Sequence, residues 1–118
     1  MLTRERSGSV LTLMLARPEV GNALNPDLLT AMERELRGAA EDPAVRVVVL
    51  TGSGKHFSAG ADLGYMKAMR GASHEANVAD AKRTQQLFAS SATAAKSCCV
   101  RFASATFASW LAPRIAFM

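Results

Sequence analysis

The sequence predicts a mixed α/β fold, and three observations support this fold class. Residues 9–15 have the pattern of a strand in which both faces are fairly apolar. Residues 45–51 form a β-branched run that is typical of a buried strand and compatible with parallel pairing. A helix lies between these strands and further helices follow them, which is the order expected of an α/β domain.

The helix between the two strands has clear start and stop signals. Asn25 is a good N-cap, Pro26 suits the first helical position, and Asp27 favours the positive end of the helix dipole. Pro43 ends the helix, because the residue before a proline avoids helical geometry. The apolar stripe consists of Leu28, Leu29, Met32, Leu36 and Ala39 or Ala40.

Two more helices are predicted after the second strand. The first spans about residues 62–69 and has Leu63, Met66 and Met69 on its apolar side. The second spans about residues 74–96. Its apolar residues are Val78, Ala81, Leu87, Phe88 and Ala92.

The composition fits one globular domain and argues against several function classes. Hydrophobic residues make up 49% and charged residues 20% of the 118 residues. The 14 Lys and Arg are scattered and no nucleic-acid-reading motif is present, so no nucleic-acid partner is expected despite a net charge of +4. No apolar run reaches the roughly 18 to 20 residues needed to cross a bilayer, and no secretory signal is recognisable, so no membrane association is expected. Cys98 and Cys99 are neighbours without metal-site spacing, which favours a reducing, cytoplasmic location and no metal.

A turn of small residues, Ser58-Ala59-Gly60-Ala61-Asp62, is the most informative local feature. Small side chains let a ligand approach the backbone, and a helix start presents unpaired N–H groups that can hold an oxyanion. The alternative is a purely structural turn in which Asp62 caps the following helix. A nucleophilic role for Ser58 is not indicated, because no G-x-S-x-G elbow surrounds it.

Several motifs, in order and at the right spacing, resemble the enoyl-CoA hydratase/isomerase family, also called the crotonase superfamily. The resemblance covers about Val10 to Lys96 and implies an incomplete crotonase-like spiral of ββα units that binds a bent acyl-CoA. The motifs are Leu15-Ala16-Arg17-Pro18, Gly21-Asn22-Ala23-Leu24, Met32-Glu33 with Leu36, residues 42–52, and residues 55–63, which read KHFSAGADL.

The resemblance also implies where the substrate would bind. Ala59, Ala61, Asp62 and Leu63 match the stretch that contacts coenzyme A, which enters as part of the substrate, and no tightly bound cofactor is expected. The backbone N–H of Ala61 matches one of two oxyanion-hole donors. These donors stabilise the enolate that forms when water adds to a 2-enoyl thioester.

Residues 63–69 resemble the helix of hydratases that act on carboxylated, methylglutaconyl-CoA-type esters. In such a protein Met66 and Met69 could line the acyl pocket. The alternative is that both methionines are adaptable core residues.

The resemblance stops near Lys96, where the composition also changes. Without gaps, Ala108-Ser109-Trp110 falls where the family has three glycines, so Ser109 falls at the second oxyanion donor. Ala112 falls where the first water-activating glutamate is expected, and no acid follows Asp80. Residues 1–96 are therefore read as the family portion, and residues 97–118 as an atypical tail that is either native or out of frame.

The sequence thus leads to two functional hypotheses. The first is an enoyl-CoA hydratase that is truncated, and weakly active or inactive alone. The second is a non-catalytic fragment or subunit that needs a partner chain. The resemblance implies a homotrimer or hexamer, but these contacts are not expected here, because residues 97–118 do not match the second half of the spiral that makes them.

Overall fold

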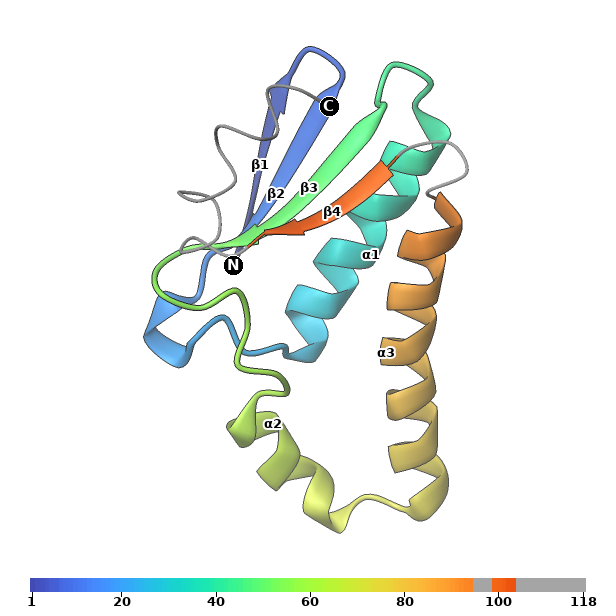
Figure 1. The fold of residues 1–118 in the computed structure, drawn as a ribbon. Helices are drawn as coiled ribbons and strands as arrows, with labels where there is room; N and C mark the ends of the chain where they lie inside the picture. Colours follow the sequence, from blue (N-terminus) through green and yellow to red (C-terminus); the bar gives the residue numbers. More distant parts are fainter. Residues whose placement is uncertain (95–98, 104–118) are drawn as a thin grey trace.

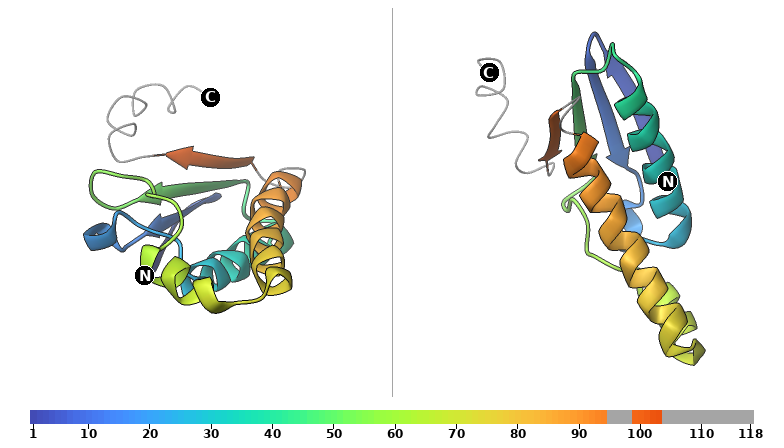
Figure 2. Two further views of the ribbon diagram at one scale, coloured as in Figure 1. Left: turned by 90° about the horizontal axis from the view of Figure 1, so that it is seen from below. Right: turned by 90° about the vertical axis from the view of Figure 1, so that its right-hand side faces the viewer.

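The computed structural model describes residues 1–94 and 99–103, with side chains described as far as residue 89. Its strands form one sheet, and helices α1 and α3 lie against the same face of that sheet (Figures 1 and 2). This arrangement confirms the predicted α/β class. The elements are β1 (Leu2–Ser7), β2 (Val10–Leu15), η1 (Pro18–Val20), α1 (Pro26–Glu41), β3 (Val47–Gly52), α2 (Leu63–Ala68), η2 (Met69–Gly71), α3 (His74–Ala94) and β4 (Cys99–Ala103).

The sheet has the strand order β1-β2-β3-β4 and mixed direction. Strands β1 and β2 form an antiparallel hairpin. β3 lies between β2 and β4 and pairs with both in parallel. Because parallel strands need a long crossover, α1 connects β2 to β3, and α2 and α3 lie between β3 and β4. The segment β1-β2-α1 is therefore one ββα unit, as the crotonase-like spiral requires.

The hydrophobic core lies between the sheet and α1. In β2 every second residue is buried, and the register places Leu11 beside Val48 and Leu13 beside Leu50 on the same face. The apolar stripe predicted for α1 faces these strands, and the Asn25 side chain accepts the Leu28 N–H at 2.9 Å. The buried cluster comprises Leu11, Leu13, Leu15, Leu28, Leu29, Met32, Leu36, Ala39, Val45, Val48, Leu50 and Leu87.

The sequence prediction missed β1, which lies at one edge of the described sheet. Its residues after Leu2 are polar or charged, and all of them are exposed. Because β1 has no buried face, its sequence lacks the alternation of apolar and polar residues by which a strand is predicted. The strand exists because it pairs residue by residue with β2, from Leu2 opposite Leu15 to Ser7 opposite Val10.

The two later helices were predicted correctly, but only part of the apolar side predicted for them is buried. α2 has no buried residue: Leu63 is 73% exposed and Met66 is 52% exposed. In α3, Val78 is 37% exposed and Ala81 is also exposed, whereas Leu87 is buried in the core. The reason is geometric, because α2 and the first turns of α3 extend past the end of the sheet (Figure 1). The side chain of Ala92 lies outside the described residues.

Within the described residues, no helix is both long enough and apolar enough to cross a membrane.

Candidate functional site

The loops that follow β2 and β3 run side by side at the end of the parallel strands. The Leu24 N–H donates to the Gly60 carbonyl at 2.7 Å, and the Asp62 N–H donates to the Leu24 carbonyl at 2.9 Å. These two bonds make Leu24 and Ala61 a one-residue parallel bridge. Backbone hydrogen bonds to the loop after β2 therefore hold the small-residue turn that was predicted from the sequence.

This bridge determines the orientation of the Ala61 backbone. In a parallel bridge the hydrogen bonds are made by the residues on either side, here Gly60 and Asp62, so the Ala61 N–H points away from Leu24. No described residue accepts a hydrogen bond from this N–H. Ala61 as a residue is exposed, and the bridge holds its N–H in a fixed direction.

Asn22 connects the two loops from the inside. It is 0% exposed, and its Oδ1 accepts the Arg17 N–H at 2.8 Å. Its Nδ2 donates to the carbonyls of Ser53 and His56, both at 2.8 Å. Its own carbonyl accepts a hydrogen bond from the Ser58 hydroxyl at 2.9 Å. The Asn22 φ of 55° lies in the left-handed region, which asparagine tolerates better than most residues.

Gly52, the last residue of β3, allows the loop to pack this closely. A Cβ at this position would lie within 3.0 Å of the carbonyl oxygens of Phe57 and His56 and of the Asn22 amide nitrogen. Two of these atoms are backbone and the third belongs to a buried side chain, so none can move aside easily. Glycine at the end of this strand is therefore a steric requirement of the site.

A second link joins Arg17 to the start of α2. One guanidinium nitrogen of Arg17 lies 3.0 Å from Asp62 Oδ2, and the other donates to the Ala23 carbonyl at 2.7 Å. Asp62 Oδ1 accepts the Tyr65 N–H at 3.1 Å, which confirms the predicted N-cap. The hydrogen bond from the Tyr65 amide, reinforced by Arg17, lowers the pKa of Asp62 below its ordinary value.

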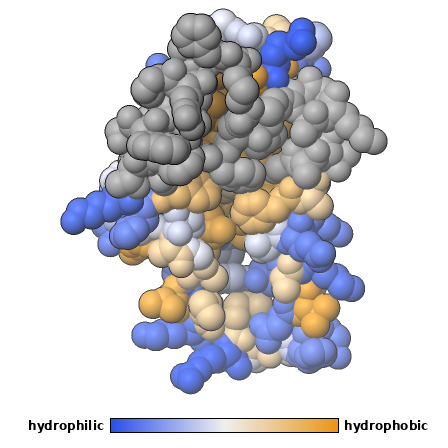
Figure 3. Space-filling view, in the orientation of Figure 1, coloured by the Kyte–Doolittle hydropathy of each residue, from blue (hydrophilic) through white to orange (hydrophobic). Residues whose placement is uncertain are grey.

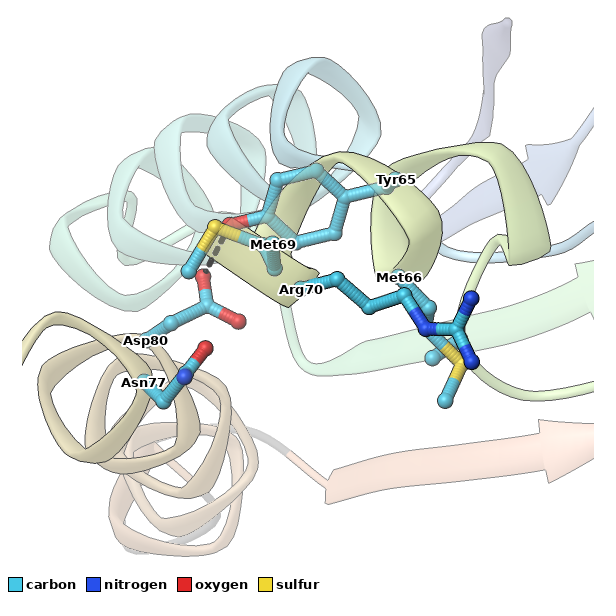
Figure 4. Close-up of a pocket in the computed structure, with 7 residues that line it drawn as sticks. Tyr65, Met66, Met69, Arg70, Asn77 and Asp80 are labelled. Atoms are coloured by element: carbon cyan, nitrogen blue, oxygen red, sulfur yellow. Dashed lines mark hydrogen bonds between the residues drawn. The ribbon is translucent and has the colours of Figure 1, made fainter. Parts of the chain in front are cut away.

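A pocket of about 220 Å³ lies beside this turn, between α2 and η2 on one side and α3 on the other (Figure 4). The Tyr65 hydroxyl donates to Asp80 Oδ1 at 2.7 Å and so ties α2 to α3. This hydrogen bond to a carboxylate raises the pKa of Tyr65. The lining residues are Ala61, Tyr65, Met66, Met69, Arg70, Asn77 and Asp80.

The structure brings together several of the residues singled out from the sequence. Ala61, Met66 and Met69 line the same pocket. Leu63 opens α2 and is exposed, and it is not among the residues that line this pocket. Ser109 lies outside the described residues.

The other two candidates, Ala59 and Asp62, flank the donor. The Ala59 N–H donates to the Gly21 carbonyl at 2.8 Å, which fixes the turn two residues before Ala61. Asp62 directly follows Ala61, and its carboxylate forms an ion pair with Arg17. Both residues therefore have structural partners within the chain, in addition to any ligand contact.

Sequence reasoning placed Arg17 and Asn22 in the family motifs, but it assigned no function in the site to these two residues or to Tyr65 and Asp80. The signal for Asn22 was available, because an asparagine after a glycine in a turn is typical of a left-handed position. No spacing rule pairs Arg17 with a residue 45 positions later. The described residues contain no group of three or more His, Cys, Asp or Glu side chains that could hold a metal ion.

The fold and the site define a class of protein: an α/β domain in which a fixed backbone donor lies beside a pocket between two helices. The sequence model of the enoyl-CoA hydratase/isomerase family matches residues 5–95. The chain therefore belongs to the enoyl-CoA hydratase/isomerase family.

Individual relatives agree with this assignment. The chain is 48% identical over 61 residues to the 2,3-dehydroadipyl-CoA hydratase of Escherichia coli, covering 52% of this chain and 24% of the relative. It is 39% identical over 64 residues to the crotonyl-CoA hydratase of Syntrophomonas wolfei, covering 53% and 25%. The crystal structure of an enoyl-CoA hydratase from Shewanella pealeana matches with a TM-score of 0.70 at 30% identity, covering 75% of this chain and 33% of that one. The matched part spans only 24% to 34% of the first curated relatives.

Proposed function

We propose that this chain binds an acyl-CoA thioester and supplies one oxyanion donor, the Ala61 N–H, for the hydration of a 2-enoyl-CoA. The observation that carries the proposal is the combination found at Ala61. Its N–H is fixed by the bridge to Leu24, has no acceptor among the described residues, and belongs to a residue that lines a pocket.

The chemistry explains why such a donor is useful. Addition of water to a 2-enoyl thioester places negative charge on the carbonyl oxygen as an enolate. A donor that is already oriented stabilises this charge more than it stabilises the substrate, and one such donor is worth about 100- to 1,000-fold in rate. Coenzyme A would arrive as part of the substrate and contact Ala59, Ala61, Asp62 and Leu63. Ser109 is the proposed position of the second donor.

The bonding of the carboxylates beside the pocket supports the proposal that the chain alone has low hydratase activity. Asp80 accepts the Tyr65 hydroxyl, and Asp62 is bound to Arg17 and to the Tyr65 amide. Both carboxylates therefore already have partners, and the lowered pKa of Asp62 makes it a weak base. We infer that the chain binds substrate but hydrates it weakly or not at all alone.

The composition of the pocket supports an acyl group that is partly apolar and carboxylated, of the methylglutaconyl-CoA type. Met66 and Met69 offer adaptable apolar surface. Arg70 and Asn77 line the same pocket and offer N–H donors, and a guanidinium binds a carboxylate well. Replacement of Arg70 by Met should weaken binding of glutaconyl-CoA more than binding of crotonyl-CoA, as measured by calorimetry. Equal losses for both ligands would argue against a carboxylated substrate.

The test of the proposed function compares two ligands that differ only at the thioester. Butyryl-CoA has the carbonyl, whereas S-butyl-CoA is the thioether without it. We expect the full chain to bind butyryl-CoA more tightly, and Ala61→Pro, which lacks the N–H, to remove this preference. Ala61→Gly keeps the N–H and is the matched control. Equal binding of both ligands by the unsubstituted chain would disprove the proposal without any variant.

The alternative function is a non-catalytic fragment or subunit that needs a partner chain, by analogy with the family's trimers and hexamers. One observation favours it: Leu63, Met66 and Val78 are large apolar side chains left exposed on α2 and α3. Figure 3 shows apolar surface across the middle of one face between hydrophilic flanks. Sedimentation of the pure chain separates the two functions, because a stable monomer that binds acyl-CoA argues against an obligate partner.

A further inference from the structure

Asn22 lies in the turn after β2 and contacts the loop after β3, which leads to Ala61. We propose that Asn22 is the positioning residue that fixes the Ala61 N–H for the thioester carbonyl. The inference rests on the proposed function, because it assumes that Ala61 is the oxyanion donor. Asn22 itself is fully buried and does not line the pocket, so it acts through other residues.

A short relay of hydrogen bonds connects Asn22 to Ala61. The Asn22 carbonyl accepts a hydrogen bond from the Ser58 hydroxyl at 2.9 Å. The same Ser58 oxygen accepts the Gly60 N–H at 3.2 Å. Gly60 has a φ of 95°, which favours glycine, and it directly precedes Ala61. The orientation of the peptide that carries the Ala61 N–H is therefore linked to the position of the Asn22 backbone.

The side chain of Asn22 fixes that backbone from the other side. Its amide accepts one N–H, from Arg17, and donates twice, to the carbonyls of Ser53 and His56. Only a carboxamide can accept and donate in this combination, since a carboxylate has no donor. An aspartate at this position would place an oxygen against two carbonyl oxygens in a buried site, which is repulsive. We therefore expect asparagine to be required here for chemical as well as steric reasons.

Two variants isolate the side chain from the backbone. Asn22→Gly tolerates the left-handed φ and can keep the hydrogen bond from Ser58, but it loses all three amide contacts. Asn22→Asp keeps the shape and the acceptor for Arg17, but it loses the two donated bonds. Leu36→Ala is the matched control, because it destabilises the core on α1 without touching either loop.

The experiment follows the Ala61 amide by NMR in the full, ¹⁵N-labelled chain, with butyryl-CoA and S-butyl-CoA as probes. In the unsubstituted chain we expect an Ala61 shift with butyryl-CoA that S-butyl-CoA does not produce. In both Asn22 variants this thioester-specific shift should be lost, and the ratio of the two Kd values should fall to about one. Shifts produced by the coenzyme A portion should remain, and Leu36→Ala should behave like the unsubstituted chain.

The outcomes distinguish the two proposals. If the unsubstituted chain shows no thioester-specific shift, the proposed function fails. If it shows the shift and both Asn22 variants keep it, the role of Asn22 is overturned. If neither Asn22 variant folds, Ser58→Ala decides, because it cuts the relay to Gly60 and leaves the Asn22 amide contacts in place. A full thioester-specific shift in Ser58→Ala would then overturn the inference.

Discussion

Two regions of the molecule are stabilised by different interactions. One region is the sheet with α1. The other is the arm, residues 63–80, which contains α2, η2 and the first part of α3. The sheet and α1 share a cluster of buried apolar side chains. The arm has no buried residue at all. Arg17 holds Asp62, which caps the first helix of the arm, and within the arm the Tyr65 hydroxyl binds Asp80. Figure 2 shows the arm projecting past the sheet.

Because of this difference, one part of the site is expected to be rigid and the other part less so. The donor Ala61 belongs to loops that are anchored to the sheet by Asn22 and by backbone bonds. Every other residue that lines the pocket belongs to the arm, whose lack of buried side chains predicts lower local stability. The structure therefore combines a rigid backbone donor with a pocket wall that has more freedom to move.

The largest expected effect contrasts one leucine from each region. Leu13 is 0% exposed, and Leu13→Ala should lower the free energy of unfolding by about 2–5 kcal/mol. Leu63 is 73% exposed, and Leu63→Ala should change the free energy of unfolding by less than about 0.5 kcal/mol. Urea unfolding of both variants measures the contrast. Similar losses in the two variants would mean that the arm is part of the same core.

The next effect contrasts two glycines that receive the same extra methyl group. Gly52→Ala should lower the free energy of unfolding by about 1–3 kcal/mol, because its Cβ would meet the loop backbone and Asn22. Gly38 lies within α1, where an added methyl group would meet no neighbouring atom within 4 Å, so Gly38→Ala should raise stability by about 1 kcal/mol. Thermal unfolding provides the comparison. A neutral Gly52→Ala would show that the loop packing is looser than described.

The polar link at Asp62 predicts a pH dependence confined to the arm. Its pKa is lower in the folded chain than the ordinary value of 3.8, so its contribution to stability is complete above that value and is lost as the pH falls through the folded-state pKa. Amide hydrogen exchange of Tyr65, relative to an amide of α1, should therefore accelerate in acid. In Asp62→Asn, which keeps a capping side chain, this acid step should disappear. Its persistence would assign the step to another group.

The smallest expected effect concerns the hydrogen bond between α2 and α3. Tyr65→Phe should cost about 0.5–1.5 kcal/mol, and it should appear as faster exchange in the arm with little change in global unfolding. Because the pKa of Tyr65 is raised, the contribution of this bond is complete below pH 10 and is lost as the pH rises through the folded-state pKa. The Phe variant should lack this alkaline step. An unchanged exchange pattern would mean that the bond does not hold α2 against α3.

Much of the fold could be predicted because its signals are local. The helix at α1 follows from the Asn25 cap and the apolar spacing, and the strands β2 and β3 follow from their apolar runs. The exposure of Met66 and Val78 could not be predicted. Apolar spacing on a helix shows that one face can be buried, but it does not show whether another element is present to cover that face.

The sequence alone predicts the α/β class, the N-caps of α1 and α2, the family and the small-residue turn that contains Ala61. Each of these depends on residue type and short-range spacing. Only the tertiary structure decided that β1 pairs with β2 and that Asn22 joins both loops. It alone also paired Arg17 with Asp62, and Tyr65 with Asp80. The reason is physical, because hydrogen bonds between distant segments depend on how the chain brings those segments together.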